Sequence, residues 1–253
     1  MPTTHATQML QSLRSLHQGS GLELRVHDLT ALGLADYATA VAVMDALVQR
    51  PAHDPDVLLL LEHPPVATLG RKGGADQLRA TQWTDANGRT VQVPVHAVAR
   101  GGNVTMHAPG QLVGYPIVQL AQLAGPVGTG PFGDLPRYVR ELEEALVTVC
   151  AQFGVACQQR PGYSGVWCSD TDKIASIGVG VRNGWAMHGF ALNVDPPLAL
   201  FELMVPCGLP GVRLTSLAAQ CRGATPALSE VATAVSLELQ RHLRRRSLAA
   251  TGL

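Results

Sequence analysis

The sequence predicts a single α+β domain in which helices pack on a mixed β-sheet. Helical and extended patterns are interleaved without a sustained βαβ period, and no motif recurs at a fixed spacing. No Ser/Gly-rich linker divides the 253 residues, of which 46% are hydrophobic, so the chain can bury one large core. We expect residues 1–253 to form one domain, with about 1–22 as an N-terminal extension and about 226–253 as a C-terminal helix.

The composition excludes several classes of protein. Nineteen Lys and Arg balance nineteen Asp and Glu, so no overall field attracts nucleic acid or an anionic membrane surface. The longest apolar run, residues 57–61, is far shorter than the ~20 residues of a membrane span. The N-terminus lacks the apolar core of a secretory signal, and five irregularly spaced cysteines do not suit a disulfide framework. We therefore expect a cytoplasmic protein with no nucleic-acid partner, no membrane association and at least one free thiol.

Three helices are predicted from apolar periodicity and from the residues that begin and end helices. The first follows Asp36 as its N-cap and ends at about residue 50. The second follows Asp134, carries Pro136 in its first turn and ends before Gly154. The third covers about residues 229–246. A Gly- and Pro-rich stretch, residues 125–133, is predicted to be a surface loop.

Two extended segments precede the second helix. Residues 56–62 are continuously apolar rather than alternating, which is typical of a strand buried on both faces. Residues 91–99 are strand-like and lead into a loop, residues 100–111, that holds three glycines and a proline beside Arg100 and His107. Such a loop suits recognition of an anion or a carbonyl group, because its amides approach a ligand closely beside a cation. A tight turn with a structural histidine is the alternative.

The clearest local signal is a β-hairpin around Asn183-Gly184, the preferred two-residue type I′ turn. With residue 182 opposite 185, one side of the ribbon carries Gly178 opposite Gly189. The same side pairs Ser176 with Ala191 and Gly180 with Met187, whereas the other pairs Ala175 with Leu192, Ile177 with Phe190 and Val179 with His188. The first side has little side-chain bulk, and glycine within a strand often marks close approach of a ligand or of another backbone. We interpret it as a shallow apolar trough.

Two residues are candidates for covalent chemistry. Cys207 lies between Pro206 and Gly208, and a thiol attacks a carbonyl only as the thiolate, which requires a base or a cation nearby. Lys173 begins the first strand of the hairpin. Each has a structural alternative, a buried small hydrophobe for the cysteine and a solvated strand end for the lysine. Strict alternation also places Lys173 on the side opposite the trough, so its strand must be locally distorted if it acts there.

Metal and nucleotide chemistry find no support in the sequence. It contains no C-x-x-C, no H-E-x-x-H and no closely spaced carboxylate set, so we expect no metal site and no bound cofactor. It also contains no G-x-x-x-x-G-K-[ST] and no G-x-S-x-G. ATP-dependent and serine-hydrolase mechanisms both lose support.

Taken together, these segments resemble the lipoyl(octanoyl) transferase family. The matching motifs are Glu62-His63-Pro64-Pro65-Val66, residues 100–116, Gly165-Val166-Trp167, residues 173–178, residues 188–194 and Pro206-Cys207-Gly208. They occur in the family's order and cover about residues 23–220. The resemblance implies a fold similar to the catalytic domain of biotin and lipoate protein ligases.

The resemblance also implies a ping-pong acyl transfer. Cys207 takes octanoyl from octanoyl-acyl carrier protein as a thioester, and the ε-amine of a lysine on a lipoyl domain then accepts it. Implied acceptors are the E2 subunits of 2-oxoacid dehydrogenases and the glycine cleavage H protein. Lys173 matches the lysine whose ammonium favours the thiolate. The residues implied to contact substrate are Arg100, Gly101, Gly102, Asn103, Val104, Thr105, Met106, His107, Ser176, Ile177, Gly178, Gly189, Phe190 and Ala191.

Three positions depart from the family pattern. Met106 replaces a common aromatic residue, which is expected to alter the shape of the pocket. Ala108 replaces a common glycine in a loop that can require positive φ, and Ala186 replaces a hydroxyl residue. Two alternative functions stay open: an ATP-dependent lipoate or biotin ligase, and a non-catalytic relative that binds acyl groups or lipoyl domains. Cys207 disfavours the ligase, which needs no thiol, and the pairing of Cys207 with Lys173 disfavours the non-catalytic relative.

Overall fold

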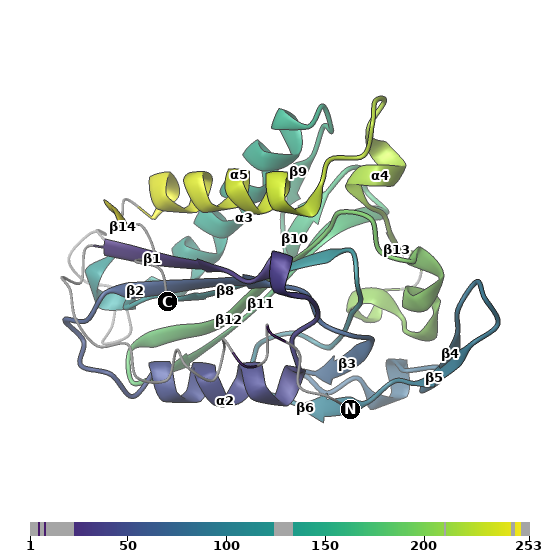
Figure 1. Cartoon of the computed structure of the whole chain (residues 1–253), viewed down its shortest axis with the longest axis horizontal. Coiled ribbons are helices and arrows are strands. Elements are labelled where there is room, and N and C mark those ends of the chain that lie inside the picture. Colours follow the sequence, from purple (N-terminus) through teal and green to yellow (C-terminus); the bar gives the residue numbers. More distant parts are fainter. Residues whose placement is uncertain are drawn as a thin grey trace.

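A computed structural model describes residues 23–123, 134–209, 211–243 and 246–248, together with the isolated positions 5 and 8. Its centre is a nine-stranded mixed sheet (Figure 1), which confirms the predicted fold class. Eight strands lie in the order β14 (Arg246–Leu248), β1 (Glu23–Asp28), β2 (Asp56–Leu61), β8 (Gln111–Ile117), β12 (Trp185–Asn193), β11 (Asp172–Arg182), β10 (Tyr163–Trp167) and β9 (Gln158–Arg160). The ninth strand, β13 (Arg213–Leu214), pairs in parallel with β11.

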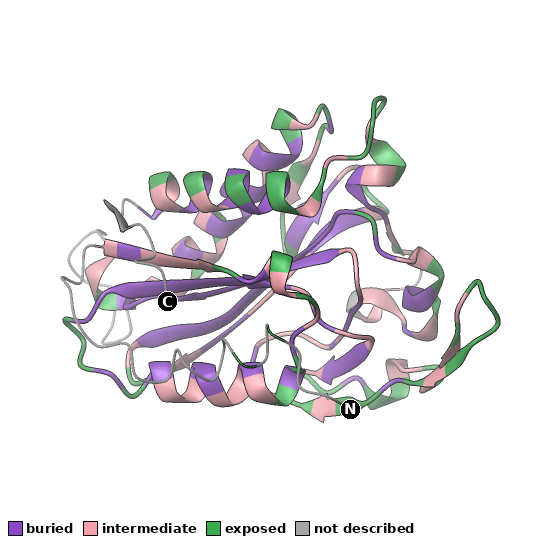
Figure 2. Ribbon diagram, viewed as in Figure 1, coloured by how far each residue is buried: buried purple, intermediate pink, exposed green. Residues whose placement is uncertain are grey.

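Helices cover both faces of this sheet. The long helices α3 (Leu135–Gln152) and α5 (Leu228–His242) lie on one face, and α2 (Tyr37–Leu47) lies on the other (Figure 1). The central strands are buried between these layers (Figure 2), and β2 is buried at every residue because both of its faces are covered. Leu58 and Leu60 pack with α3 and α5. The alternate residues Val57, Leu59 and Leu61 pack with α2 on the opposite face.

Smaller elements lie near one end of the main sheet (Figure 1). A second sheet has the order β6 (Val95–Ala97), β3 (Val66–Leu69) and β7 (Val104–His107), and β4 (Gln82–Thr84) pairs with β5 (Thr90–Gln92). One further short α-helix is α4 (Leu217–Gln220). The 3₁₀ segments are η2 (Thr30–Leu32), η3 (Ala75–Gln77), η4 (Leu120–Gln122), η5 (Leu198–Leu203) and η6 (Pro206–Gly208).

The predicted helix starts are confirmed. Asp36 accepts a hydrogen bond from the Thr39 amide at 2.7 Å, and Asp134 accepts one from the Arg137 amide at 2.9 Å. The third helix is shorter than predicted, because α5 ends at His242 and residues 246–248 form β14 beside β1. The predicted loop at 125–133 lies outside the described residues.

The hairpin register is confirmed at every predicted pair, from Ala175 with Leu192 to Arg182 with Trp185. Asn183 and Gly184 both have positive φ, as a type I′ turn requires. The predicted strand at 91–99 is instead divided at Pro94 between β5 and β6, which belong to different sheets. A proline has no amide hydrogen to contribute to a ladder, which accounts for the break. Within the described ranges, no helix is long and apolar enough to cross a membrane.

Candidate active site

A cavity of about 340 Å³ lies where β10 separates from β11. The two strands pair only as far as Val166 with Ala175, so the next residues of β11 have an open edge. The loop after β6 lies against this edge, and the Gly101 amide donates to the Val179 carbonyl at 2.8 Å. The walls include Arg100, Gly101, Gly102, Asn103, Val104, Thr105, Lys173, Ser176, Ile177, Gly178 and Pro206. Most residues predicted to bind substrate therefore surround one space.

Arg100 fixes the glycine-rich loop from within. Its guanidinium is buried and donates to the Thr68 carbonyl at 2.8 Å, to the Thr68 hydroxyl at 2.7 Å and to the Gly101 carbonyl at 2.9 Å. Gly70 leaves room for this arrangement, because a Cβ there would lie 2.8 Å from Arg100 Nη1 and 2.3 Å from the Gly102 carbonyl oxygen. Arg100 thus has a structural role in addition to lining the cavity.

The predicted trough is largely filled by the chain itself. A Cβ on Gly178 would lie 2.9 Å from Arg100 Cδ, and one on Gly180 would lie 2.5 Å from the Ala99 carbonyl oxygen. A Cβ on Gly189 would lie 2.4 Å from the carbonyl oxygen of Gly114 in β8. These glycines accommodate close approach of other parts of the chain, so the predicted trough is narrower than expected and is not purely apolar. A small second cavity remains there, lined by Ser176, Gly178, Gly189 and Ala191, and the main open space lies at the edge of β11.

His188 was not identified from the sequence as part of this region. Register alone places it on the side opposite the trough, but its φ of 59° is left-handed. Its imidazole lines the small second cavity with Arg100, Gly178 and His107. Burial lowers the pKa of His188 to about 4, and the charge of Arg100 acts in the same direction. Sequence patterns do not predict a positive φ at a strand residue other than glycine, which is why the placement of His188 was not predicted.

The second cavity also accounts for the remaining predicted contacts, with one exception. Thr105, His107, Ser176, Gly178, Gly189, Phe190 and Ala191 line it. Met106 lines neither cavity and packs in a buried cluster with Ala67 and Leu200. Its side chain therefore does not shape either cavity by direct contact, contrary to the expectation from the sequence. Among the described residues, only Asn183 and His188 are non-glycine residues with positive φ, so Ala108 carries no such strain.

Lys173 reaches the main cavity because the strand is distorted, as its candidate role requires. Val166 pairs with Ala175 but Trp167 pairs with Lys173, a shift of one residue that interrupts strict alternation. The side chain is buried, and its Nζ donates to the Ser164 carbonyl at 2.8 Å. Nζ also lies 5.1 Å from the centre of the Trp167 ring, within the range of a cation–π interaction.

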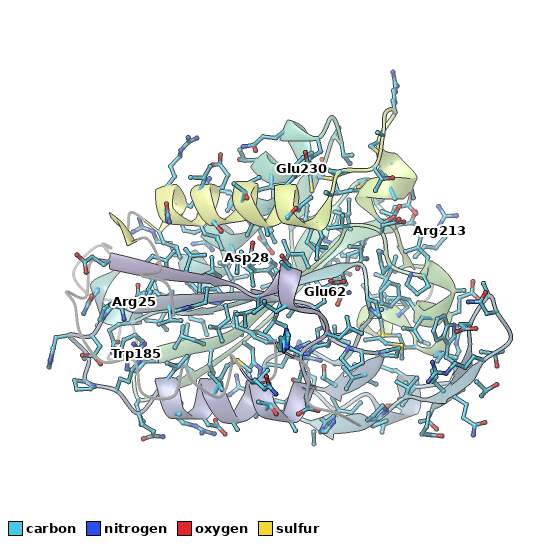
Figure 3. All side chains as sticks on the ribbon, in the orientation of Figure 1. Arg25, Asp28, Glu62, Trp185, Arg213 and Glu230 are labelled. Carbon is cyan, nitrogen blue, oxygen red and sulfur yellow. The ribbon has the colours of Figure 1, made fainter. Side chains whose placement is uncertain are left out.

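The strand segment around Lys173 is anchored on its outer side. Arg213 of β13, labelled in Figure 3, donates from Nε to Asp172 at 3.0 Å and pairs with the same carboxylate through Nη2 at 2.9 Å. The Thr215 amide donates to the Lys173 carbonyl at 2.9 Å.

Glu62, also labelled in Figure 3, anchors the other end of the glycine-rich loop. Its carboxylate accepts a hydrogen bond of 2.6 Å from the Gly110 amide and so holds the far end of the loop that begins at Arg100.

Cys207 is placed by its neighbours. Its backbone forms η6, while its side chain lies outside the described part of the structure. Pro206 lines the same cavity as Lys173. Gly208 has a φ of 65°, and a Cβ there would lie 3.0 Å from Asn103 Nδ2. Position 207 is therefore between a residue of the cavity wall and a residue packed on the glycine-rich loop.

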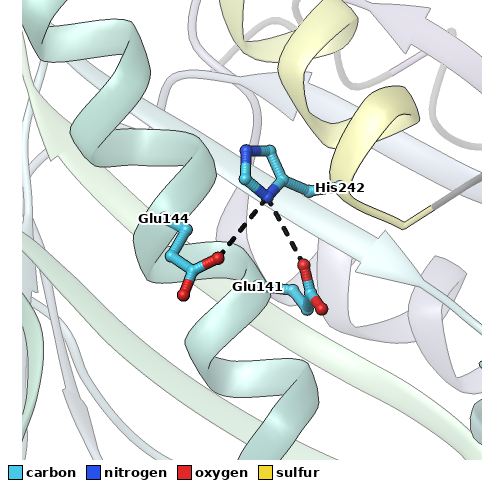
Figure 4. Close-up of side chains that lie close together, drawn as sticks. All are labelled: Glu141, Glu144 and His242. Carbon is cyan, nitrogen blue, oxygen red and sulfur yellow. Dashed lines mark hydrogen bonds and ion pairs between the residues drawn. The ribbon is translucent and has the colours of Figure 1, made fainter. Parts of the chain in front are cut away.

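A group of possible metal ligands lies between α3 and α5. The Nδ1 atom of His242 is 3.4 Å from Glu141 and 3.9 Å from Glu144 (Figure 4). Among the described residues, Glu141, Glu144 and His242 form the group of three side chains whose ligand atoms lie close enough together to hold a metal ion. Arg137 pairs with Glu141 at 3.5 Å within α3, and His242 of α5 forms a hydrogen bond with Glu141, so contacts among protein side chains account for this group.

Comparisons with known proteins agree with the motifs. Residues 36–240 match the family model of the lipoyl protein ligase A/B catalytic domain. An octanoyltransferase of Geobacter metallireducens is 45% identical over 190 residues, covering 74% of this chain and 80% of that protein. An octanoyltransferase of Mycobacterium leprae is 42% identical over 215 residues, covering 83% and 84% of the two chains.

Two solved structures share the fold at low sequence identity. Lipoate-protein ligase A bound with ATP has a TM-score of 0.63 and 14% identity, covering 90% of this chain and 89% of its own. The bipartite lipoate protein ligase of Thermoplasma acidophilum has a TM-score of 0.58 and 15% identity, covering 92% and 89%. These likenesses confirm the predicted similarity in fold to lipoate ligases.

Proposed function

The chain belongs to the lipoyl protein ligase A/B catalytic domain family and, within it, to the octanoyltransferases, and from that membership we propose its reaction. It is an acyltransferase that moves octanoyl to protein in lipoylation. The donor is octanoyl-acyl carrier protein, and the acceptor is a lysine ε-amine on a lipoyl domain. We assign as acceptors the E2 subunits of 2-oxoacid dehydrogenases and the glycine cleavage H protein.

The reaction has two acyl-transfer steps. The Cys207 thiolate attacks the carbonyl carbon of the donor thioester, the carbon–sulfur bond to the carrier breaks, and the carrier thiolate leaves and takes up a proton. The acceptor amine then attacks the enzyme thioester, loses a proton and displaces the Cys207 thiolate, which leaves an octanoyl amide. The Lys173 ammonium stabilises the thiolate in the resting enzyme. In the first step it gives its proton to the departing carrier thiolate and becomes a neutral amine, and in the second step that amine takes the proton lost by the acceptor amine, which restores the ammonium beside the Cys207 thiolate.

The observation that carries this proposal is that Lys173, Pro206 and the loop from Arg100 line one cavity. The same walls supply Val104, Leu135, Val139, Ile177, Val179, Met204 and Leu214, which suit a saturated chain that offers only methylenes. Burial of each methylene contributes about 0.8 kcal/mol. Any oxyanion stabilisation by this loop comes from amides other than that of Gly101, which donates to Val179.

Intact-mass spectrometry after mixing with octanoyl-acyl carrier protein tests the proposal. We expect one octanoyl adduct on the wild-type protein without ATP, none on Cys207→Ser, and an unchanged adduct on the control Cys221→Ser. An adduct that requires ATP would favour a ligase, and no adduct under either condition would favour a protein that only binds its partners. Transfer from the isolated adduct to a lipoyl domain tests the second step.

A further inference from the structure

One peptide group near the cavity lies between two opposite charges. The carbonyl of Ser164 accepts a hydrogen bond from Lys173 Nζ at 2.8 Å. The amide of the next residue, Gly165, donates to Glu143 Oε1 at 2.8 Å. Because this carbonyl and this amide belong to the same peptide plane, a carboxylate and an ammonium are joined through a single peptide group.

Glu143 is a charged helix residue whose side chain is buried. It belongs to α3 beside the apolar stripe that packs on the sheet, and it is 7% exposed. Burial raises the pKa of Glu143, while the Gly165 hydrogen bond and the charges of Lys173 and Arg140 act in the opposite direction and Glu144 adds to the rise. Burying a carboxylate costs free energy unless the charge is paired and hydrogen-bonded.

We propose that Glu143 is a positioning residue for Lys173, acting through the Ser164–Gly165 peptide to hold the ammonium at the cavity wall. The peptide dipole has its amide end at the carboxylate and its carbonyl end at the ammonium. Each hydrogen bond polarises the group for the other, so the charge of Glu143 strengthens the contact with Nζ. The proposal rests on the proposed function of Lys173 for its catalytic meaning.

The residues around Lys173 allow its side chain to lie against the Ser164–Gly165 peptide. Gly165 has a φ of 121°, and a Cβ there would lie 2.4 Å from Lys173 Cε, so the lysine stem passes directly over the peptide. The Trp167 ring that Lys173 contacts also lies against the Arg160 guanidinium, 4.9 Å from its centre. A second cation on the same ring gives the carboxylate a larger part in balancing charge around Lys173.

The test compares Glu143→Gln with Glu144→Gln. The first keeps an oxygen that accepts from Gly165 and removes the charge. The second removes a charge one residue along the same helix, from a side chain that is 55% exposed and faces His242. The rate at which acetic anhydride modifies Lys173 is measured across pH by peptide mass spectrometry, without any acyl donor or acceptor.

We expect Lys173 of E143Q to be modified about fivefold faster at pH 8, with its pH profile displaced to lower pH, because loss of the carboxylate disfavours the ammonium. E144Q should match the wild-type protein. If Glu143 only braces the loop, E143Q will have the wild-type profile at Lys173 even where its melting temperature falls, and this result overturns the proposal.

A double-mutant cycle gives an independent measurement. The free energy of unfolding in urea is compared for E143Q, Lys173→Met and the double variant. We expect coupling between the two sites, whereas additive effects contradict the proposal. Neither readout uses octanoyl, so failure of the wild-type protein to form the Cys207 adduct would refute the proposed function and not this coupling.

Discussion

The side chain of Lys173 lies against the backbone of Gly165 so closely that position 165 admits no Cβ. An added Cβ would be 2.4 Å from Cε and 2.9 Å from Nζ of the lysine. Gly165 belongs to the Gly-Val-Trp motif, and its conformation is required by the residue that we assign to proton transfer. This relationship makes the motif a structural partner of Lys173.

Gly165→Ala should therefore slow acylation of Cys207 by about 100-fold, because displacing a reacting group by about 1 Å costs that much. The control is Gly154→Ala, which also has positive φ at 73° but nothing within 4 Å of an added Cβ. Both variants should lose about 1 kcal/mol or more of stability from backbone strain. The octanoyl adduct is followed by mass spectrometry over time, and a wild-type rate in G165A would contradict the close contact.

Local signals predicted much of this fold. Asp36 and Asp134 cap helices through contacts a few residues away, and Asn183-Gly184 determines the register of the strands around it. Turn and cap chemistry depends on neighbours in the chain, which is why sequence patterning suffices there. The same reasoning fails at residues 246–248, whose pairing with β1 is a contact across the whole chain.

Most of the residues predicted to bind substrate line one of two cavities, but the shape of these cavities was not predictable. The low bulk of Gly178 and Gly180 is visible in the sequence, yet their space is taken by the segment at Ala99 and Arg100, a long-range contact. Glu143 was missed because a single carboxylate beside an apolar helical stripe is ordinarily a solvated neighbour of that stripe. Its partner, the Gly165 amide, is on a strand that sequence periodicity does not connect to the helix.

Arg100 should not be replaceable by lysine. The guanidinium donates to three oxygen atoms of Thr68 and Gly101, and a lysine ammonium cannot reproduce that planar arrangement. We expect R100K to lose about 2 kcal/mol in urea unfolding, because buried acceptors lose their donors. The control, Arg89→Lys on the exposed turn between β4 and β5, should be neutral. Equal stability of R100K and R89K would show that the loop is held by other contacts.

Two buried histidines predict a loss of stability in mild acid. Burial lowers the pKa of His63 to about 4 and that of His107 to about 3. In the unfolded chain each titrates near 6.5, so the unfolded state binds more protons below that pH. The stability from keeping these rings neutral is fully present above about pH 6.5 and is lost as the pH falls toward 4.

The measurement is urea unfolding between pH 7 and 4. His63 is fully buried, and its ring nitrogens lie 2.7 Å from the Ala35 carbonyl and 2.8 Å from the Tyr115 hydroxyl. His63→Gln will start from a lower stability, but its slope against pH should be shallower by about 1.4 kcal/mol per pH unit over most of this window. The exposed control His53→Gln should keep the wild-type slope. An unchanged slope in H63Q would mean that this ring is not held neutral.

Cys157 and Cys168 should form a disulfide when the protein is oxidised. Their sulfur atoms are 3.2 Å apart. Gln158 pairs with Trp167 between antiparallel strands, so Cys157 and Cys168, the next residue on each side, face each other. A hydrogen bond with the Cys150 thiol and burial raise the pKa of Cys157 to about 12, so little thiolate is present at neutral pH. The reaction should be slow at pH 7 and should accelerate with pH, because the thiolate is the attacking species.

Oxidised glutathione supplies the oxidising equivalents: a protein thiolate forms a mixed disulfide, and the second thiol displaces glutathione. Peptide mapping in a Cys207→Ser background should recover the 157–168 disulfide and none with Cys221, and Cys157→Ser should abolish it. Since Trp167 precedes Cys168 and contacts the Lys173 ammonium, the disulfide should also change the rate at which Cys207 is acylated. Oxidised glutathione can modify Cys207 as well, so this rate is compared between the oxidised wild-type protein and a Cys157→Ser control treated in the same way. Equal rates in the two proteins would show that the cysteine pair is separate from the active site, and if Cys157 and Cys168 stay reduced at pH 9, the thiols are not positioned for bonding.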